Sequence, residues 1–185
     1  MAQQRLAKRR MDLAFAALLS DDDAAVLEAL ARIGSEGDAR SIRPLLCAYA
    51  RADRPSVRQR IAALLNQVKA EGAAEALAEA LDDPELLSAR HAALSAFWSA
   101  GLDARAYLAR FVDIAIEGSP QESLECLTIV QEQDAWPEKA ARAGAARLRE
   151  ASRREQDAFK ASVLSDMAEE LNARLGKGGA EEQRN

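Results

Sequence analysis

Few side chains in this sequence are suited to chemistry, and their spacing argues against an active site. The chain holds one histidine, His91, and two cysteines, Cys47 and Cys126. A metal centre built from several histidines is therefore excluded, and no Cys-x-x-Cys pair, P-loop glycine pattern or Gly-x-Ser-x-Gly motif occurs. Catalysis needs an activated nucleophile, an acid or base of tuned pKa, or a metal. The sequence thus predicts a protein that is not an enzyme, with no metal and no cofactor.

The acidic clusters and the cysteines have structural explanations. Runs of aspartate at positions 21–23 and 82–83 precede helix-like segments, where a carboxylate caps the first turn and lies near the positive end of the helix dipole. Cys126 occupies an inward helix position, and Cys47 lies off the main apolar stripe of its helix. Two distant cysteines do not make a disulfide framework, so we expect a reducing compartment and a cytoplasmic protein.

Charge argues against nucleic acid as the expected partner. The 185 residues include 25 Lys and Arg against 30 Asp and Glu, a net charge of −5, whereas a phosphate-binding surface needs a positive excess. Arginines cluster near the start and again at Arg147, Arg149, Arg153 and Arg154. On helices such residues usually pair with carboxylates. The alternative function is nucleic-acid binding by this Arg-rich C-terminal helix.

The first twenty residues place a basic stretch before an apolar one, as an export signal does. Asp12 interrupts the apolar part, and no small-residue cleavage site follows. We therefore expect an amphipathic first helix whose apolar residues turn inward; they are Leu6, Leu13, Phe15, Leu18 and Leu19. No apolar run reaches the length of a membrane span, so no membrane partner is expected.

An apolar pattern of helix length recurs four times, in segments that begin at residues 22, 57, 89 and 122. The residues expected to face inward are Val26, Ala29, Leu30 and Ile33; Ile61, Leu64, Leu65 and Val68; Ala93, Ala96, Phe97 and Ala100; and Cys126, Ile129 and Val130, with polar Gln133 at the last position. A pattern that recurs at the spacing of these four segments is typical of stacked helical pairs, because each pair needs a neighbour to bury its apolar face. Composition agrees: 49% of the residues are hydrophobic but only 4% are aromatic, which favours an all-α fold.

Prolines, glycines and capping aspartates divide the chain into helices. We expect helices at residues 4–19 and 22–33, a helix capped by Asp38, one from Ser56 to about Ala70, a short one around Leu77 and Leu81, one from Pro84 to Ala100, one capped by Asp103, and one ending near Gln133. Residues 1–136 would form the repeat stack, 137–175 a C-terminal helix or helix pair packed on it, and 176–185 a disordered tail. Ser152 and Glu155 either form a capping box that begins a separate helix or lie within one helix.

The C-terminal segment has an apolar face of its own, formed by Phe159, Val163, Met167, Leu171 and Leu175. A stack of repeats needs a cap, so we expect this face to cover the open end. The alternative is a homodimer that forms through this C-terminal helix.

Two segments resemble HEAT repeats of the HEAT and armadillo superfamily. One is DRPSVRQRIAALL, with Asp53, Pro55, Val57, Arg58 and Leu65; the other is DDPELLSARHAALSAFWSAG, with Pro84, Ala89, Arg90, Phe97 and Gly101. The first and fourth units lack the Val-Arg pair. The resemblance implies a short right-handed α-solenoid of about four helical hairpins, whose second helices line the concave side. It also implies that Arg58 and Arg90 bridge neighbouring repeats and that the protein recognises another protein.

The residues expected to line the concave groove are small and nearly neutral. They are Ala24, Glu28 and Arg32; Gln59, Ala63 and Gln67; His91, Ser95 and Ser99; and Leu124, Thr128 and Glu132. HEAT-like bacterial alkylpurine DNA glycosylases depend instead on a basic groove. We therefore predict a non-catalytic interaction module, a scaffold or adaptor, that binds a protein or peptide. The candidate contact residues are Gln59, Gln67, His91, Ser95, Trp98 and Trp136, although the two tryptophans could equally fill gaps between units.

Overall fold

The computed structural model describes residues 2–20 and 22–175, and these residues form helices joined by short turns, with no strand among them. The all-α class predicted from the sequence is confirmed. The chain forms two compact units, one up to Leu102 and one from Asp103 onward. The tail predicted at 176–185 lies outside the described residues.

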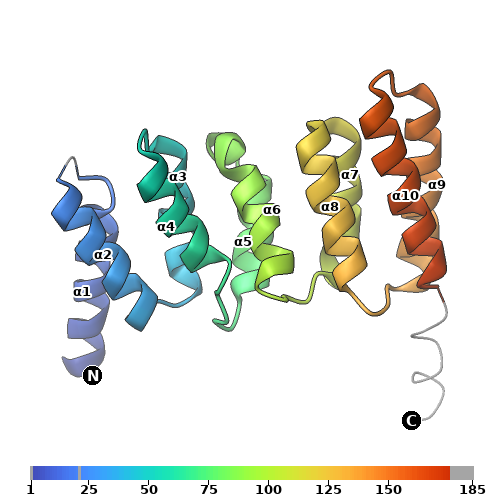
Figure 1. Ribbon diagram of the computed structural model, residues 1–185. Coiled ribbons are helices and arrows are strands. Elements are labelled where there is room, and N and C mark those ends of the chain that lie inside the picture. Colours follow the sequence, from blue (N-terminus) through green and yellow to red (C-terminus); the bar gives the residue numbers. More distant parts are fainter. Residues whose placement is uncertain (1, 21, 176–185) are drawn as a thin grey trace, which may run out of the picture. The chain divides into compact units, whose positions relative to one another are not determined.

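Three helical pairs make up the first unit (Figure 1). They are α1 (Ala2–Ala17) with α2 (Asp23–Glu36), α3 (Ile42–Arg51) with α4 (Pro55–Leu65), and α5 (Ala73–Leu81) with α6 (Arg90–Ser99). Each helix packs on its partner, and the pairs are joined because α2 packs on α4, α4 on α6, and α3 on α5. Turns of 3₁₀ helix at Ala39–Ser41 and Pro84–Ala89 precede α3 and α6.

The apolar pattern predicted most of the core of the first unit, although Leu64 and Val68, also predicted to face inward, are only half-buried. Val26, Leu30 and Ile33 of α2, Ile61 and Leu65 of α4, and Ala93, Ala96 and Phe97 of α6 are buried. Burying such side chains contributes about 1.5–3 kcal/mol each for the larger ones, so these stripes hold the pairs together. Asp22, Asp38 and Asp83 cap the following turns, since their carboxylates accept backbone N–H groups at 2.9 to 3.0 Å.

Several helix ends differ from the prediction. Helix α2 continues through Gly34 to Glu36 and ends at Gly37, whose N–H donates to the carbonyl of Ile33. Helix α4 ends at Leu65 rather than near Ala70, so Gln67 lies in a turn. The segment from Pro84 begins as 3₁₀ helix and becomes α-helical only at Arg90. A helix interior tolerates glycine at a cost of about 1 kcal/mol, so Gly34 does not have to end α2. The positions of the other helix ends depend on how the turns pack.

The predicted inward face of the first helix is wrong for three of its residues. Leu6 is 60% exposed, Leu13 66% and Leu19 49%, whereas Leu18 is buried as predicted, together with Met11 and Ala14, which were not predicted. Helix α1 therefore turns a different side toward α2, and Leu6 and Leu13 lie on its outer surface. Periodicity alone could not distinguish the two sides, because both carry apolar residues at helical spacing.

Between residues 103 and 175, the second unit contains a 3₁₀ turn (Arg105–Tyr107) and four helices, α7 (Leu108–Glu117), α8 (Pro120–Glu132), α9 (Glu138–Arg154) and α10 (Ala158–Ala173). Helices α7 and α8 pack together, α9 packs on α7, and α10 packs on both α9 and α8. The segment 137–175 is thus two helices. Asp157 caps the second by accepting the N–H of Lys160 at 2.8 Å, while Ser152 lies in α9 and donates to the carbonyl of Ala161.

The apolar face of α10 is buried inside its own unit. Val163, Met167 and Leu171 are almost fully covered, together with Leu164 and Ala168, whereas Phe159 is 53% exposed and Leu175, beyond the end of α10, is half-buried. The stripe considered for a homodimer therefore packs on α8 and α9 of the same chain.

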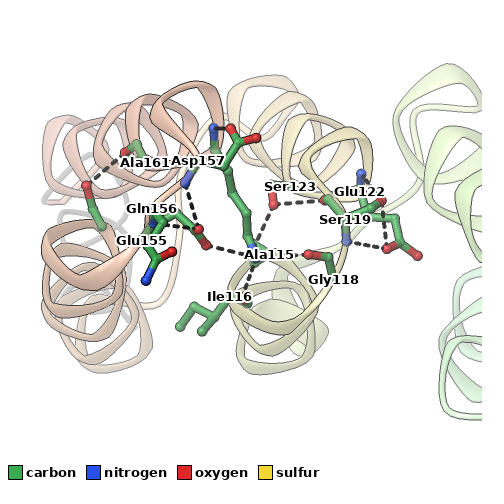
Figure 2. A network of polar contacts seen from close by, with 12 residues as sticks. Ala115, Ile116, Gly118, Ser119, Glu122, Ser123, Glu155, Gln156, Asp157 and Ala161 are labelled. Carbon is green, nitrogen blue, oxygen red and sulfur yellow. Dashed lines mark hydrogen bonds and ion pairs between the residues drawn. The ribbon is translucent and has the colours of Figure 1, made fainter.

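A polar network joins two turns of the second unit (Figure 2). The ammonium of Lys160, 8% exposed, donates to the carbonyls of Ile116 and Gly118 at 2.7 and 2.9 Å and lies 3.3 Å from a carboxylate oxygen of Glu155. Ser119 and Glu122 form a capping box at the start of α8. A cation thus pairs with the carbonyl groups at the C-terminal end of α7, where the helix dipole favours positive charge.

Candidate functional site

The candidate site is the exposed surface of α2, α4 and α6 in the first unit, which we call the B face. These three helices pack in series, α2 on α4 and α4 on α6. Their apolar stripes point into the core, so the opposite positions meet solvent: Ala24 and Glu28 of α2, Gln59 and Ala63 of α4, and His91 of α6 are exposed. Arg32, Ser95 and Ser99, which belong to the same predicted row, are half-buried.

A hollow of about 320 Å³ lies between α2 and α4 on the B face. We call it the α2–α4 hollow; its lining residues are Leu30, Ala31, Gly34, Arg60, Ala63 and Leu64. Small residues leave this space. A Cβ at Gly34 would stand 3.0 Å from Cδ2 of Leu64, so the glycine allows α2 and α4 to approach closely. Leu27, two turns before Gly34 on α2, is 42% exposed beside this helix surface.

The charges around the hollow are few. Arg32 pairs with Glu28 at 3.1 Å in an i, i+4 arrangement on α2, which neutralises both. Arg60 lines the hollow, is exposed, and has no ion-pair partner among the described residues. An apolar hollow with one cation at its edge suits an apolar side chain that has a carboxylate nearby.

The sequence-predicted contact residues divide into three groups. Gln59, Gln67 and His91 are exposed, and Ser95 and Trp98 are half-buried on α6. Trp136 belongs to the second unit and is 4% exposed; its indole N–H donates to the carbonyl of Val130 at 3.2 Å. The structure therefore gives Trp136 the gap-filling position that was the alternative interpretation, and we leave it out of the site.

Sequence reasoning missed the hollow itself. Ala31, Gly34 and Arg60 were not among the predicted contact residues, although small residues at i, i+3 spacing on α2 were visible in the sequence. This signal identifies a close helix approach only once the neighbouring helix is known.

Arg58 acts locally. Its Nε donates to the carbonyl of Ala52 at 2.7 Å, and its guanidinium lies 5.5 Å from the centre of the Tyr49 ring. These contacts close the turn between α3 and α4, because Ala52 is the C-cap residue that follows α3. The structural role expected for Arg58 is thus carried out within one helical pair rather than between two.

The C-terminal arginines pair with carboxylates of the second unit. Arg147 lies 2.6 Å from Asp113, and Arg153 and Arg154 both pair with Glu150 one turn earlier on α9. These pairs reduce the positive potential that a phosphate backbone would need.

Among residues 2–20 and 22–175, no group of three or more His, Cys, Asp or Glu side chains could hold a metal ion. The carboxylates with shifted pKa values lie at helix starts and turns: Arg40 lowers the pKa of Asp38, Arg105 lowers that of Asp103, and the N–H of Glu85 lowers that of Asp83. A lowered pKa keeps a carboxylate ionised, whereas a general acid at neutral pH needs a raised one.

No family model, curated protein or solved structure matches this chain. Within the described part of the chain, none of the helices combines the length and the apolar composition that crossing a membrane requires. Helices and short connecting turns account for all the residues that the structure describes.

Proposed function

We propose that the protein is a non-catalytic interaction module that binds a protein or peptide partner on the B face of its first unit. The observation that carries this proposal is the α2–α4 hollow, in which exposed alanines, a glycine and two leucines lie beside Arg60. Anchoring side chains of interfaces fill such apolar depressions, while polar residues surround them.

The surroundings of the hollow support a protein partner over a phosphate backbone. Gln59, Ala63 and His91 are exposed on α4 and α6, and the charged pair Glu28 and Arg32 is internally neutral. We also propose that the chain is a HEAT-like α-solenoid of cytoplasmic location, in which the helical pairs form repeats. The Val-Arg start of α4 and the series of packed second helices support this proposal.

The test places two arginines at the hollow. In the Ala31→Arg, Ala63→Arg variant, two long charged side chains occupy the depression and exclude an apolar side chain of the partner. Tagged protein is used to capture partners from the source organism, and the captured protein is purified and titrated by calorimetry. We expect the dissociation constant to rise at least a hundredfold in the variant, as it does when an interface loses a central anchoring side chain.

The matched control is Ala143→Arg, Ala146→Arg, which changes two exposed alanines of α9 in the second unit. It adds the same charge and should leave the affinity unchanged. Equal weakening by both variants would show that net charge, rather than the hollow, governs binding. Unchanged affinity of the α2–α4 variant, with an unchanged melting temperature, would contradict the proposal.

Nucleic-acid binding through the Arg-rich helix is the second candidate, and the ion pairs of Arg147, Arg153 and Arg154 weigh against it. It predicts retention on DNA or RNA that falls steeply with salt. If the protein passes through a DNA column at 50 mM salt without being retained, nucleic-acid binding is contradicted.

A further inference from the structure

The outer side of α1, which faces away from α2, carries two exposed leucines. Met11 and Ala14 turn toward the core, whereas Leu6 is 60% exposed and Leu13 66%. Seven residues separate the two leucines, so they lie two turns apart along one side of the helix, at a spacing of about 10 Å. Water therefore covers two large apolar side chains on a helix whose other side is already packed.

Cations stand beside these leucines. Arg9 and Arg10 each lie one helical turn from both Leu6 and Leu13, and all of these positions are exposed. Helix α1 has a net charge of +3 in a chain whose net charge is −5, because it holds four basic residues and one acidic residue. These are Arg5, Lys8, Arg9, Arg10 and Asp12. We call the surface formed by Arg5, Leu6, Arg9, Arg10 and Leu13 the α1 ridge.

Most of the positive charge on α1 has no partner within the protein. Arg10 pairs with Glu36 at 3.2 Å, but Arg5, Lys8 and Arg9 form no ion pair with any residue that the structure describes. Exposed cations contribute little to stability even when they are paired. The fold therefore does not explain why three unpaired cations accompany two exposed leucines on one helix.

Helix α9 is also rich in arginine, and it differs from the α1 ridge in both respects. Its only leucine, Leu148, is buried, and alanines occupy exposed positions such as Ala143 and Ala146. Four of its arginines pair with carboxylates: Arg142, Arg147, Arg153 and Arg154. The combination of unpaired cations with exposed leucines thus sets α1 apart from this second basic helix.

From these observations we infer that the α1 ridge binds the surface of a bilayer that contains anionic lipid, with α1 parallel to the membrane plane. Leu6 and Leu13 enter the boundary between the headgroups and the acyl chains, and the arginines pair with lipid phosphates. Long arginine side chains reach the headgroups while the leucines lie deeper. The sequence-based expectation of no membrane partner considered only membrane spans, and a helix that lies on a bilayer does not need that length.

Two other kinds of partner fit the α1 ridge less well. A nucleic acid would engage the arginines through its phosphates but would leave the leucines in water. The core of a protein interface is depleted in charged residues, whereas Arg9 and Arg10 stand between the two leucines. A bilayer suits both residue types because its phosphates and acyl chains lie at different depths. This contact is independent of the B face, which α2, α4 and α6 form.

The experiment measures co-sedimentation of the full-length protein with vesicles. One set of vesicles contains phosphatidylcholine alone, and the other contains phosphatidylcholine with about 30% phosphatidylglycerol. We expect the partition coefficient to be about tenfold or more higher for the anionic vesicles and to fall as salt is added, because salt screens exposed cations. Equal binding to both sets, or no binding to the anionic set at low salt, would overturn the inference.

Charge variants test whether the α1 ridge is the surface that binds. Arg5→Gln with Arg9→Gln removes two unpaired cations and should lower the partition coefficient on anionic vesicles about thirtyfold, since each cation near the surface contributes about fivefold. The matched control, Arg149→Gln with Arg153→Gln, removes the same charge from α9 and should change it by less than about twofold. An equal loss in both variants would show that net charge alone governs binding and would overturn the inference.

Leucine variants separate insertion from simple electrostatic adsorption. Leu6→Gln with Leu13→Gln should leave the melting temperature unchanged, because both leucines are exposed, but should lower the partition coefficient about tenfold or more. Undiminished binding of this variant would mean that the leucines stay in water, which contradicts the inference. Retention of the wild type on DNA at low salt, without binding to anionic vesicles, would assign the arginines to a nucleic acid instead.

Discussion

The ammonium of Lys160 lies 3.3 Å from a carboxylate oxygen of Glu155, and this pair joins the α9–α10 turn to the end of α7 (Figure 2). Lys160 also donates to the carbonyls of Ile116 and Gly118, which α7 leaves without helical partners. One buried cation therefore satisfies a helix end and a neighbouring turn, and the stability of the second unit should depend on it.

Replacing Lys160 by methionine keeps the apolar stem but removes the charge. Two carbonyls then lose the ammonium as donor, and Glu155 loses one of its donors, in a partly buried place, so we expect a loss of about 2–4 kcal/mol in the free energy of unfolding. Urea denaturation followed by circular dichroism measures it. Lys139→Met, at an exposed position of α9, should change the free energy by less than about 0.5 kcal/mol. Equal stability of the two variants would show that the network is dispensable.

Glu155 should make stability depend on pH in the acidic range. The backbone N–H of Asp157, and then the ammonium of Lys160, hold the pKa of Glu155 below its ordinary value of 4.5. A carboxyl whose pKa is lowered by folding stabilises the protein above the unfolded pKa, and this contribution disappears as pH falls through the folded pKa. The stability difference between wild type and Glu155→Gln should therefore be largest at pH 6 and should decrease as the pH falls below 4.5.

Measuring the effect of Glu155→Gln on stability against pH in the Lys160→Met variant separates the two causes of the lowered pKa of Glu155. Because the N–H of Asp157 is the larger cause, part of the pH dependence should remain without the ammonium. Complete loss would assign the effect to Lys160 alone, and a difference that stays constant from pH 6 to pH 3 would contradict the role of Glu155.

The two tryptophans should report different environments. Trp136 is 4% exposed and donates to Val130, while Trp98 is half-buried on α6. Trp98→Phe leaves Trp136 as the fluorophore, and Trp136→Phe leaves Trp98. We expect emission at shorter wavelength and weaker acrylamide quenching from Trp136. Quenching of equal strength in both variants would show that Trp136 is accessible and would return it to the candidate contact residues.

The helical repeat pattern predicted which residues are buried where each helix has neighbours on its inner side. Ile61 and Phe97 illustrate this, because the 3.6-residue period fixes which positions share a face. The period does not say which face a neighbour covers, and the prediction consequently failed for Leu6 and Leu13 of α1. The apolar pattern also could not predict the α2–α4 hollow. It depends on how closely Gly34 approaches Leu64, two residues whose contact no local signal specifies.

Helix α1 gives a direct test of this difference between pattern and packing. Leu6→Gln with Leu13→Gln changes two leucines that are 60% and 66% exposed, so the free energy of unfolding should change by less than about 0.5 kcal/mol. Met11→Ala removes a buried side chain from the interface with α2 and should cost about 2–3 kcal/mol, because the transfer free energy and a cavity term add. Both are measured by urea denaturation. The opposite order, with the leucine variant the less stable, would show that α1 turns its leucines inward after all.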